Sequence, residues 1–287
     1  MFYMSNQDLL SAESHFAFGK NWLDYAQKID EAKIAQAVSD LQRLSGRNRF
    51  DGLSFLDIGC GSGLHSLAAI RMGAVRVVGV DIDPDSVEAS RITLARFAPK
   101  ADAQFDVVSV FDMRPETYGD FDWVYSWGVL HHTGDMRRAL MVAASLVKPG
   151  GGVMVALYKK TRFCSLWRVI KRWYSTATPL AQRRAMRVRT GLQRFFMERI
   201  GGGSLDEYIG NYGTSRGMDF YNDLHDWMGG YPYESISPEE CRAFFRGLGF
   251  KPEREFVAVP HSRASRYLQG LLGSGCDEYT FVRPRLN

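Results

Sequence analysis

Residues 55–63 read FLDIGCGSG, a short apolar run that leads into three alternate glycines, Gly59, Gly61 and Gly63. Residues 64–72 follow with the composition of a helix. Glycine lets the backbone turn tightly and approach a ligand closely, and the N-terminus of the following helix offers unpaired N–H groups. This strand–loop–helix stretch therefore predicts a binding site for a nucleotide-like ligand.

The spacing of the glycines differs from that of the dinucleotide-binding fingerprint. That fingerprint requires Gly-x-Gly-x-x-Gly, whereas Leu64 stands here at the place of the third glycine, which argues against NAD and FAD. The next apolar run, residues 75–80, ends at Asp81. A carboxylate at the C-terminal edge of a strand can accept both hydroxyls of a ribose, so we expect Asp81 to bind one. The alternative role, capping the next helix, suits Asp83 better.

Short apolar runs alternate with helical stretches between residues 54 and 157. This alternation predicts parallel β/α units, in which helices cover both faces of the sheet. Residues 250–259 and 278–282 are expected to form closing strands. The runs within the alternating region are residues 54–58, 75–80, 105–110, 123–126 and 153–157.

Taken together and in this order, these motifs resemble those of class I S-adenosylmethionine-dependent methyltransferases. The resemblance covers residues 53–157 and is weaker at the closing strands. The core motifs are similar to those of quinone-type O-methyltransferases and of many natural-product enzymes. The matching segments are the first motif at residues 56–63, the ribose-binding position at Asp81 and Ile82, the adenine-flanking residues 109–112, the fourth strand at 121–127 and the turn at 148–151.

The resemblance implies an α/β fold with a Rossmann-like seven-stranded sheet whose last strand is antiparallel. It also implies methyl transfer by in-line attack of an acceptor atom on the sulfonium methyl of S-adenosylmethionine, with Trp127 near the transfer centre. We expect no metal, because the sequence has no clear ligand cluster and the methyl group is already activated. The implied cofactor-binding residues are Asp57, Gly59, Cys60, Gly61, Gly63, Asp81, Ile82, Ser109, Val110 and Trp127.

Outside the core motifs, the sequence suggests two further parts. Residues 1–50 are expected to form an N-terminal helical cap, and residues 158–235 a basic helical lid, inserted into a core of residues 51–157 and 236–287. Two amphipathic helices are predicted in the lid. The first has an apolar face of Leu166, Val169, Ile170 and Trp173 opposite Arg168, Lys171 and Arg172; the second has an apolar face of Ala181, Ala185, Val188, Leu192 and Phe195.

Two groups of residues are candidates for contact with the acceptor. His132, and after it His131, follow the fourth strand, where the near-neutral pKa of histidine suits base catalysis. A packing role is the alternative for both. An aromatic patch before the first helix and a polar, aromatic cluster in the lid are expected to bind the acceptor, although packing of the lid also explains them. These residues are Trp22, Tyr25, Asn222, His225, Asp226, Trp227 and Tyr231.

Composition places the 287-residue chain among globular proteins, with 45% apolar and 24% charged residues. No apolar run reaches the 18 or so residues of a membrane span, and the opening residues do not resemble a signal peptide. Four isolated cysteines argue against a disulfide framework and a zinc site. We therefore expect a cytoplasmic protein.

Positive charge is concentrated in one segment of the chain. Residues 159–199 hold twelve basic residues and one acidic residue, whereas the remainder has a net charge of −7. This favours a small, anionic acceptor, with a quinone or lipid delivered from a membrane as the alternative. Nucleic acid is disfavoured because the aromatics of the segment are expected on buried helix faces. A cofactor-binding protein without catalysis is disfavoured by the intact glycine loop and Asp81. The methylated atom and the oligomeric state stay open.

Overall fold

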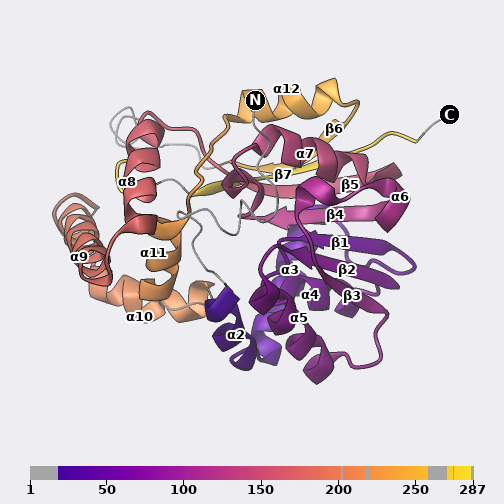
Figure 1. Cartoon of the computed structure of the whole chain (residues 1–287), viewed down its shortest axis with the longest axis horizontal. Coiled ribbons are helices and arrows are strands. Elements are labelled where there is room, and N and C mark those ends of the chain that lie inside the picture. The colour runs from indigo at the N-terminus through magenta and orange to yellow at the C-terminus, as the bar shows by residue number, and fades with distance from the viewer. Residues whose placement is uncertain (1–18, 202, 217–219, 258–269, 274, 286–287) are drawn as a thin grey trace.

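The computed structural model describes residues 19–201, 203–216, 220–257, 270–273 and 275–285 (Figure 1). A seven-stranded sheet has the order β3-β2-β1-β4-β5-β7-β6. Strands β1 to β5 pair in parallel, and β7 is antiparallel to both neighbours, which confirms the predicted sheet. The strands are β1 Ser54–Ile58, β2 Arg76–Asp81, β3 Ala103–Val107, β4 Phe121–Trp127, β5 Val147–Tyr158, β6 Lys251–Phe256 and β7 Cys276–Val282.

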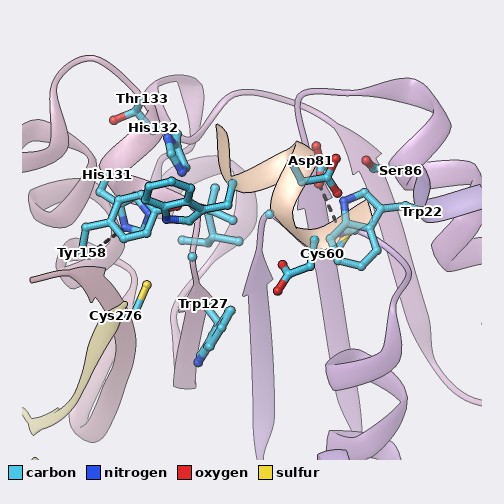
Figure 2. A pocket seen from close by; sticks show the side chains of 18 of the residues that line it. Trp22, Cys60, Asp81, Ser86, Trp127, His131, His132, Thr133, Tyr158 and Cys276 are labelled. Carbon is cyan, nitrogen blue, oxygen red and sulfur yellow. Dashed lines mark hydrogen bonds between the residues drawn. The ribbon is translucent and has the colours of Figure 1, made fainter. Parts of the chain in front are cut away.

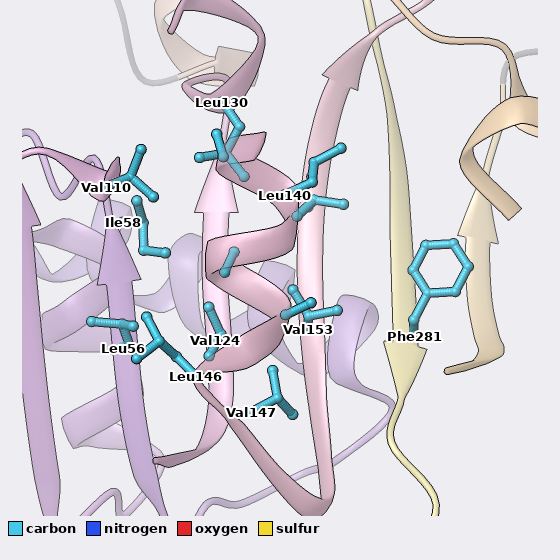
Figure 3. Close-up of a cluster of buried hydrophobic side chains, with 14 of the residues drawn as sticks. Leu56, Ile58, Val110, Val124, Leu130, Leu140, Leu146, Val147, Val153 and Phe281 are labelled. Carbon is cyan, nitrogen blue, oxygen red and sulfur yellow. The ribbon is translucent and has the colours of Figure 1, made fainter. Parts of the chain in front are cut away.

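Helices cover both faces of this sheet, as the strand–helix alternation predicts (Figure 1). All five residues of β1 are buried, and its three apolar residues divide between two apolar clusters. Leu56 and Ile58 pack towards α7 and α12, a cluster shown in Figure 3, and Phe55 packs towards α3 and α4. The core helices are α3 Glu31–Ser45, α4 Leu64–Arg71, α5 Pro84–Phe97, α6 Pro115–Tyr118, α7 Met136–Ser145 and α12 Pro238–Gly247, with 3₁₀ turns η1 Val110–Asp112 and η2 Leu130–His132.

Side-chain caps set several of these boundaries. Asp83 caps α5 by accepting the N–H of Asp85, as the sequence indicates, and Ser237 forms a capping box with Glu240 at α12. The third strand ends at Val107 instead of residue 110. The reason is local: the Ser109 hydroxyl accepts the Phe111 N–H at 3.2 Å and starts η1.

The N-terminal helix α2, Gly19–Gln27, is attached to the sheet through α5. The Gly19 N–H donates to the Asp83 carboxylate at 2.9 Å, and the Asn21 side-chain amide donates to Asp226 at 2.7 Å. This helix therefore bridges the core and the inserted segment. Residues 1–18 of the expected N-terminal cap lie outside the described residues.

Helices occupy most of the segment between β5 and α12, and Figure 1 shows them together at one end of the molecule. We call α8 to α11 the insertion helices. None of the described helices is long and apolar enough to cross a membrane. The insertion helices are α8 Cys164–Thr176, α9 Pro179–Phe196, α10 Leu205–Arg216 and α11 Phe220–Gly229, with a π-helical turn at Met197–Gly201.

The face predicted to pack inward on α8 is wrong for three of its four residues, since only Ile170 packs, partly buried, against apolar clusters. Leu166, Val169 and Trp173 are between 50% and 66% exposed. Lys171, expected outside, is fully buried, and its ammonium donates to the Trp227 carbonyl. The prediction failed because aromatic rings and the aliphatic stem of a lysine cover the body of the protein as well as aliphatic side chains do. The buried residues of α8 are Cys164, Trp167, Lys171 and Tyr174.

The face predicted to pack inward on α9 is wrong for Val188, Leu192 and Phe195, whereas Ala185 packs, partly buried, against an apolar cluster. No residue of this helix is buried, and Val188, Leu192 and Phe195 are between 48% and 64% exposed. The side of α9 that approaches the protein instead carries Arg189 and Gln193, which hydrogen bond to each other at 2.6 Å. The expectation that the aromatics of this segment are buried is therefore also wrong for Phe195 and, on α8, for Trp173.

Close packing between β4 and β5 gives a test of the fold. A Cβ at Gly152 would lie 2.4 Å from the Trp123 ring. We expect Gly152→Ala to lower the free energy of unfolding by about 1–3 kcal/mol, because a buried ring would have to shift. Urea unfolding measures the difference. Gly191→Ala on α9, where nothing lies within 4 Å, should instead stabilise slightly, and equal effects would contradict this packing.

Candidate functional site

A cavity of about 1630 Å³ lies at the C-terminal edge of the parallel strands. It is lined by strand ends at Ile58, Asp81, Trp127 and Tyr158 and extends to the insertion helices. Pockets for a single drug-sized ligand commonly measure about 300–1,000 Å³. The cavity therefore has room for two ligands side by side, and Figure 2 shows part of its wall.

The glycine loop forms one wall of this cavity. Gly59, Cys60 and Gly61 line it, and Gly63 ends the loop as the N-cap of α4. Gly63 has φ of +73°, and a Cβ there would lie 2.9 Å from the Ser90 Cα. No other residue fits this position, because both the left-handed backbone and the contact exclude a side chain. The loop thus brings backbone close to the cavity and opens the N-terminus of α4.

Asp81 stands beside this loop at the end of β2 (Figure 2). Its carboxylate accepts the Gly61 N–H at 3.1 Å and the Asp83 N–H at 3.0 Å. Burial raises the pKa of Asp81 to about 6. Ile82 follows it in the cavity wall, and Trp22 of α2 lies across the loop, 3.1 Å from where a Gly61 Cβ would be. These residues make a partly enclosed, hydrogen-bonding pocket.

A second acidic residue lies deeper in the same wall. Asp57 is 2% exposed and accepts the Ser66 hydroxyl at 2.7 Å. Burial raises the pKa of Asp57 to about 7, and the charge of Asp81 acts in the same direction. The hydroxyl of Tyr125, paired with Asp57 across β1 and β4, is buried without a hydrogen-bond partner among the described residues. The Tyr125 hydroxyl is therefore a polar group of the wall that the described part of the protein does not satisfy.

The remaining expected cofactor residues also line the cavity. Ser109 and Val110 lie beyond β3, and Trp127 lies at the end of β4. The Trp127 indole N–H donates to Glu278 at 2.9 Å, and Glu278 also binds Arg43 at 2.7 Å. Neither Glu278 nor Arg43 was predicted, because they come from β7 and α3 and no linear motif links them to the loop. His65 was missed too, although its place two residues after Gly63 was a usable signal.

His131 is completely buried and lies in η2 against the Tyr158 ring, with centroids 3.9 Å apart. Its Nδ1 accepts the Tyr158 N–H at 3.3 Å. Burial holds the pKa of His131 well below its usual value, so the ring is neutral and carries its proton on Nε2. That Nε2–H donor has no acceptor within the part of the chain described. His131 is therefore suited to donate a hydrogen bond through Nε2, and its role as a base stays a prediction.

His132 lies beside His131, with ring centroids 4.4 Å apart. Its Nδ1 donates to the Pro232 carbonyl at 2.7 Å, and the backbone of Gly230 also hydrogen bonds to the ring. Burial, with a smaller contribution from Lys171, lowers the pKa of His132 to about 3. The ring is therefore neutral throughout the physiological pH range.

A buried lysine, Lys171, lies behind the two histidines. The Lys171 ammonium is 4.0 Å from the Trp227 ring centroid, 5.3 Å from that of Tyr158 and 5.4 Å from that of Tyr233. Burial lowers the pKa of Lys171 well below its usual value. The aromatic faces offset part of the cost of burying this group.

The expected acceptor residues divide into two sets. Trp22, Tyr25, Asp226, Trp227 and Tyr231 line the cavity. His225 does not, because its Nδ1 bonds to the Tyr174 hydroxyl at 2.6 Å on the side of α8. The side chain of Asn222 lies outside the described part of the structure.

The surroundings of Asp226 also affect its protonation. The Asn21 side-chain amide donates a hydrogen bond to it. Burial raises the pKa of Asp226 to about 7.

Among the residues that the structure describes, no group of three or more histidines, cysteines, aspartates or glutamates could hold a metal ion.

Comparison with known proteins adds family information to this geometry. Residues 49–195, about half of the chain, match a family model described as a methyltransferase domain. The ubiquinone biosynthesis O-methyltransferase of Xanthomonas euvesicatoria pv. vesicatoria (strain 85-10) is 34% identical over 121 residues, which are 42% of this chain and 49% of that protein. The chain thus matches about half the length of this relative.

Solved structures of low sequence identity share the fold. The magnesium protoporphyrin IX methyltransferase from Synechocystis PCC 6803, with bound SAH, is 18% identical, with a TM-score of 0.50 over 88% of this chain and 83% of that one. PKMT2 from Rickettsia typhi is 14% identical, with a TM-score of 0.57 over 88% of this chain and 53% of that one. At these identities, the likeness concerns the fold alone.

The buried carboxylate of Asp57 gives a stability test. Its pKa is about 3.9 when unfolded and about 7 when folded, so its stabilising contribution is complete below pH 4 and is lost as pH rises through 7. Relative to Asp57→Asn, which keeps an acceptor for Ser66, the wild type should lose about 2–4 kcal/mol of unfolding free energy between pH 4 and pH 8. Urea unfolding of both proteins at several pH values measures this. A difference that does not change with pH would contradict it.

Proposed function

The chain belongs to the methyltransferase domain family, and we propose that it transfers a methyl group from S-adenosylmethionine to an oxygen of a small acceptor molecule. The observation that carries this proposal is the single cavity that joins the glycine loop and Asp81 to the His131–His132 pair. A nitrogen acceptor is the second candidate. An oxygen is favoured because the His131 Nε2–H donor lacks an acceptor in the described structure.

The residues of the glycine-loop pocket fit the cofactor. A Cβ at Gly61 would reach into the space under Trp22, and the Tyr125 hydroxyl in the same wall has no described partner. Asp81 would hold the ribose hydroxyls, Ser109 and Val110 the adenine, and Asp57 with Gly59 the amino-acid end. When bound, the cofactor supplies an activated methyl group, so the protein has to position the acceptor and handle its proton.

The two histidines have different roles in the proposed reaction. In this proposal, His131 donates its Nε2–H to the acceptor and orients it, and the neutral imidazole of His132 takes the hydroxyl proton. A base of such low pKa suffices because the hydroxyl becomes strongly acidic as its oxygen gains the methyl group. A protonated His132 would fail, so its low pKa keeps it active throughout the physiological pH range.

The side of the cavity formed by the insertion helices supports an anionic acceptor. Arg168, Arg172 and Arg189 line it together with aromatic side chains of α10 and α11 and the carboxyl groups of Asp223 and Asp226, and burial raises the pKa of Asp226 to about 7. We regard the insertion as the lid of the acceptor pocket. All four cysteines are free thiols, which fits the cytoplasm as the proposed location.

Asp81 offers a direct test of cofactor binding. Asp81→Asn should weaken S-adenosylhomocysteine binding by about 1–3 kcal/mol, because the carboxylate that accepts the hydroxyls is lost. In the wild type, with a pKa of about 6, affinity at pH 5 should be about tenfold weaker than at pH 8. Calorimetry measures both effects. Unchanged affinity in the variant would remove Asp81 from the cofactor site.

His132 tests the proton transfer. His132→Ala should lower turnover about 10²- to 10⁴-fold for a hydroxyl acceptor, with S-adenosylhomocysteine affinity unchanged. The wild-type rate should show no histidine titration between pH 5 and pH 9, because the pKa is about 3. Radiolabelled methyl transfer at several pH values measures both. A rate that depends on a group near pH 6.5 and loses this dependence in the variant would contradict the assignment.

A further inference from the structure

Apolar side chains on the insertion helices face away from the protein. On α8, Leu166, Val169 and Trp173 are 51%, 66% and 50% exposed. They lie at helical spacings of three and four residues and so form one stripe. The α9 helix exposes a longer set, Leu180, Val188, Leu192 and Phe195, each about half exposed or more. Single exposed apolar residues are common, but two such sets on adjacent helices mark an interaction surface.

The inner side of α9 mixes polar and apolar residues. Arg189 and Gln193 line the cavity, Gln182 donates to the Tyr174 carbonyl at 2.9 Å, and Ala185 and Met186 pack, partly buried, against an apolar cluster. A surface helix normally keeps its larger apolar side chains inward as well. Because Val188, Leu192 and Phe195 of α9 lie outside, we infer that something apolar covers them.

Positive charge borders the same surface. Arg183, Arg184 and Arg187 on α9, and Arg172 on α8, are exposed, and none of them forms an ion pair with another described residue. The one acidic residue of the 159–199 segment, Glu198, pairs with Arg194 at 3.2 Å. Arginine beside exposed Leu, Val, Trp and Phe is the composition of a helix that lies in the interface of an anionic membrane.

The cavity reaches the surface at this place. Arg168, Arg172 and Thr176 of α8 are exposed and also line the cavity. Beneath them, the cavity wall turns aromatic and apolar, with Tyr212, Phe220 and Leu224. A molecule that arrives along α8 would therefore pass from a basic rim to an apolar interior.

We propose that the outer surface of α8 and α9 docks on an anionic lipid bilayer, with its apolar side chains inserted between headgroups and its arginines on lipid phosphates. The charge selects this occupant. A second copy of the chain would bring like charges together, and nucleic acid would leave the aliphatic stripe uncovered. In combination with the proposed function, this docking makes the acceptor an amphiphile that enters the cavity from the bilayer.

Vesicle co-sedimentation of the full chain tests the docking. The vesicles contain phosphatidylcholine alone or with phosphatidylglycerol, at low and at high salt. We expect binding to the vesicles with phosphatidylglycerol, weakened by salt, and little binding to phosphatidylcholine alone. Because this measurement needs no methyl transfer, its result is independent of whether the proposed function is right.

Two variants test the two components of the surface. Val188→Asn with Leu192→Asn should weaken vesicle binding about tenfold or more, because apolar area no longer enters the bilayer. Its matched control is Val75→Asn with Met141→Asn, which removes apolar side chains of similar exposure on the core. The control should bind vesicles as the wild type does.

The charge variant is Arg183→Gln with Arg187→Gln, and it should weaken binding about thirtyfold, as expected for two charges near an anionic surface. Lys100→Gln with Arg114→Gln, exposed on the core, changes net charge equally and should have little effect. Unchanged S-adenosylhomocysteine affinity shows that each variant is folded.

Three results would overturn the docking proposal. The first is that vesicles with phosphatidylglycerol do not bind the chain, or bind all variants equally. The second is a dimer in sedimentation equilibrium that Val188→Asn with Leu192→Asn dissociates, which would make the surface an interface between copies. The third is that the charge variant loses affinity only for a duplex oligonucleotide.

Discussion

The parallel pairing of β1 with β2 is the constraint on which the site depends. Ile58 pairs with Val80, and beyond this pair the N–H groups of Gly59 and Cys60 both donate to the Val80 carbonyl, at 2.7 and 3.0 Å. The glycine loop is thus fixed to the end of β2, where the Gly61 N–H meets Asp81. Apolar clusters on both faces hold this register, because a slip of one residue would turn Phe55 and Leu56 to the wrong sides.

The cavity contains ionisable groups whose burial is unfavourable for stability. Asp57, Asp81 and Asp226 line the cavity and have raised pKa values, and Lys171, which lies behind the histidines of the wall, has a lowered one, because each is removed from water. Groups of this kind gather where ligands bind, since a ligand supplies the partners that water would otherwise provide. These buried ionisable groups, which extend from the glycine loop to the insertion helices, therefore lower the stability of the fold.

The insertion helices combine two environments. Their inner sides hold a lysine among aromatic rings and an arginine against a glutamine, while their outer sides hold aliphatic and aromatic residues beside unpaired arginines. Burial of Trp167 and Tyr174 satisfies the inner side, but the exposed outer apolar side chains gain nothing from water. In the docking proposed above, a bilayer would cover them, and the proposed methyl transfer would act on a molecule that is shared between the bilayer and the protein.

Much of this protein was determined by local sequence. The glycine loop, the caps Asp83 and Ser237 and the alternating apolar runs each depend on neighbours a few residues away, so the sheet, the loop and the place of Asp81 could be predicted. Partnerships between distant elements could not. Glu278 reaches Trp127 from β7, and the Tyr158 N–H donates to the Nδ1 of His131, which places the His131 proton on Nε2.

The same holds for the direction in which α8 and α9 face. Helical periodicity shows that a helix has an apolar side, but only the tertiary structure decides whether that side meets the protein or its surroundings. Here Trp167, Lys171 and Tyr174 pack inward and leave Val169 and Trp173 outside. The physical reason is that burial is a property of the whole packed assembly, whereas a sequence pattern records only which residues share a face.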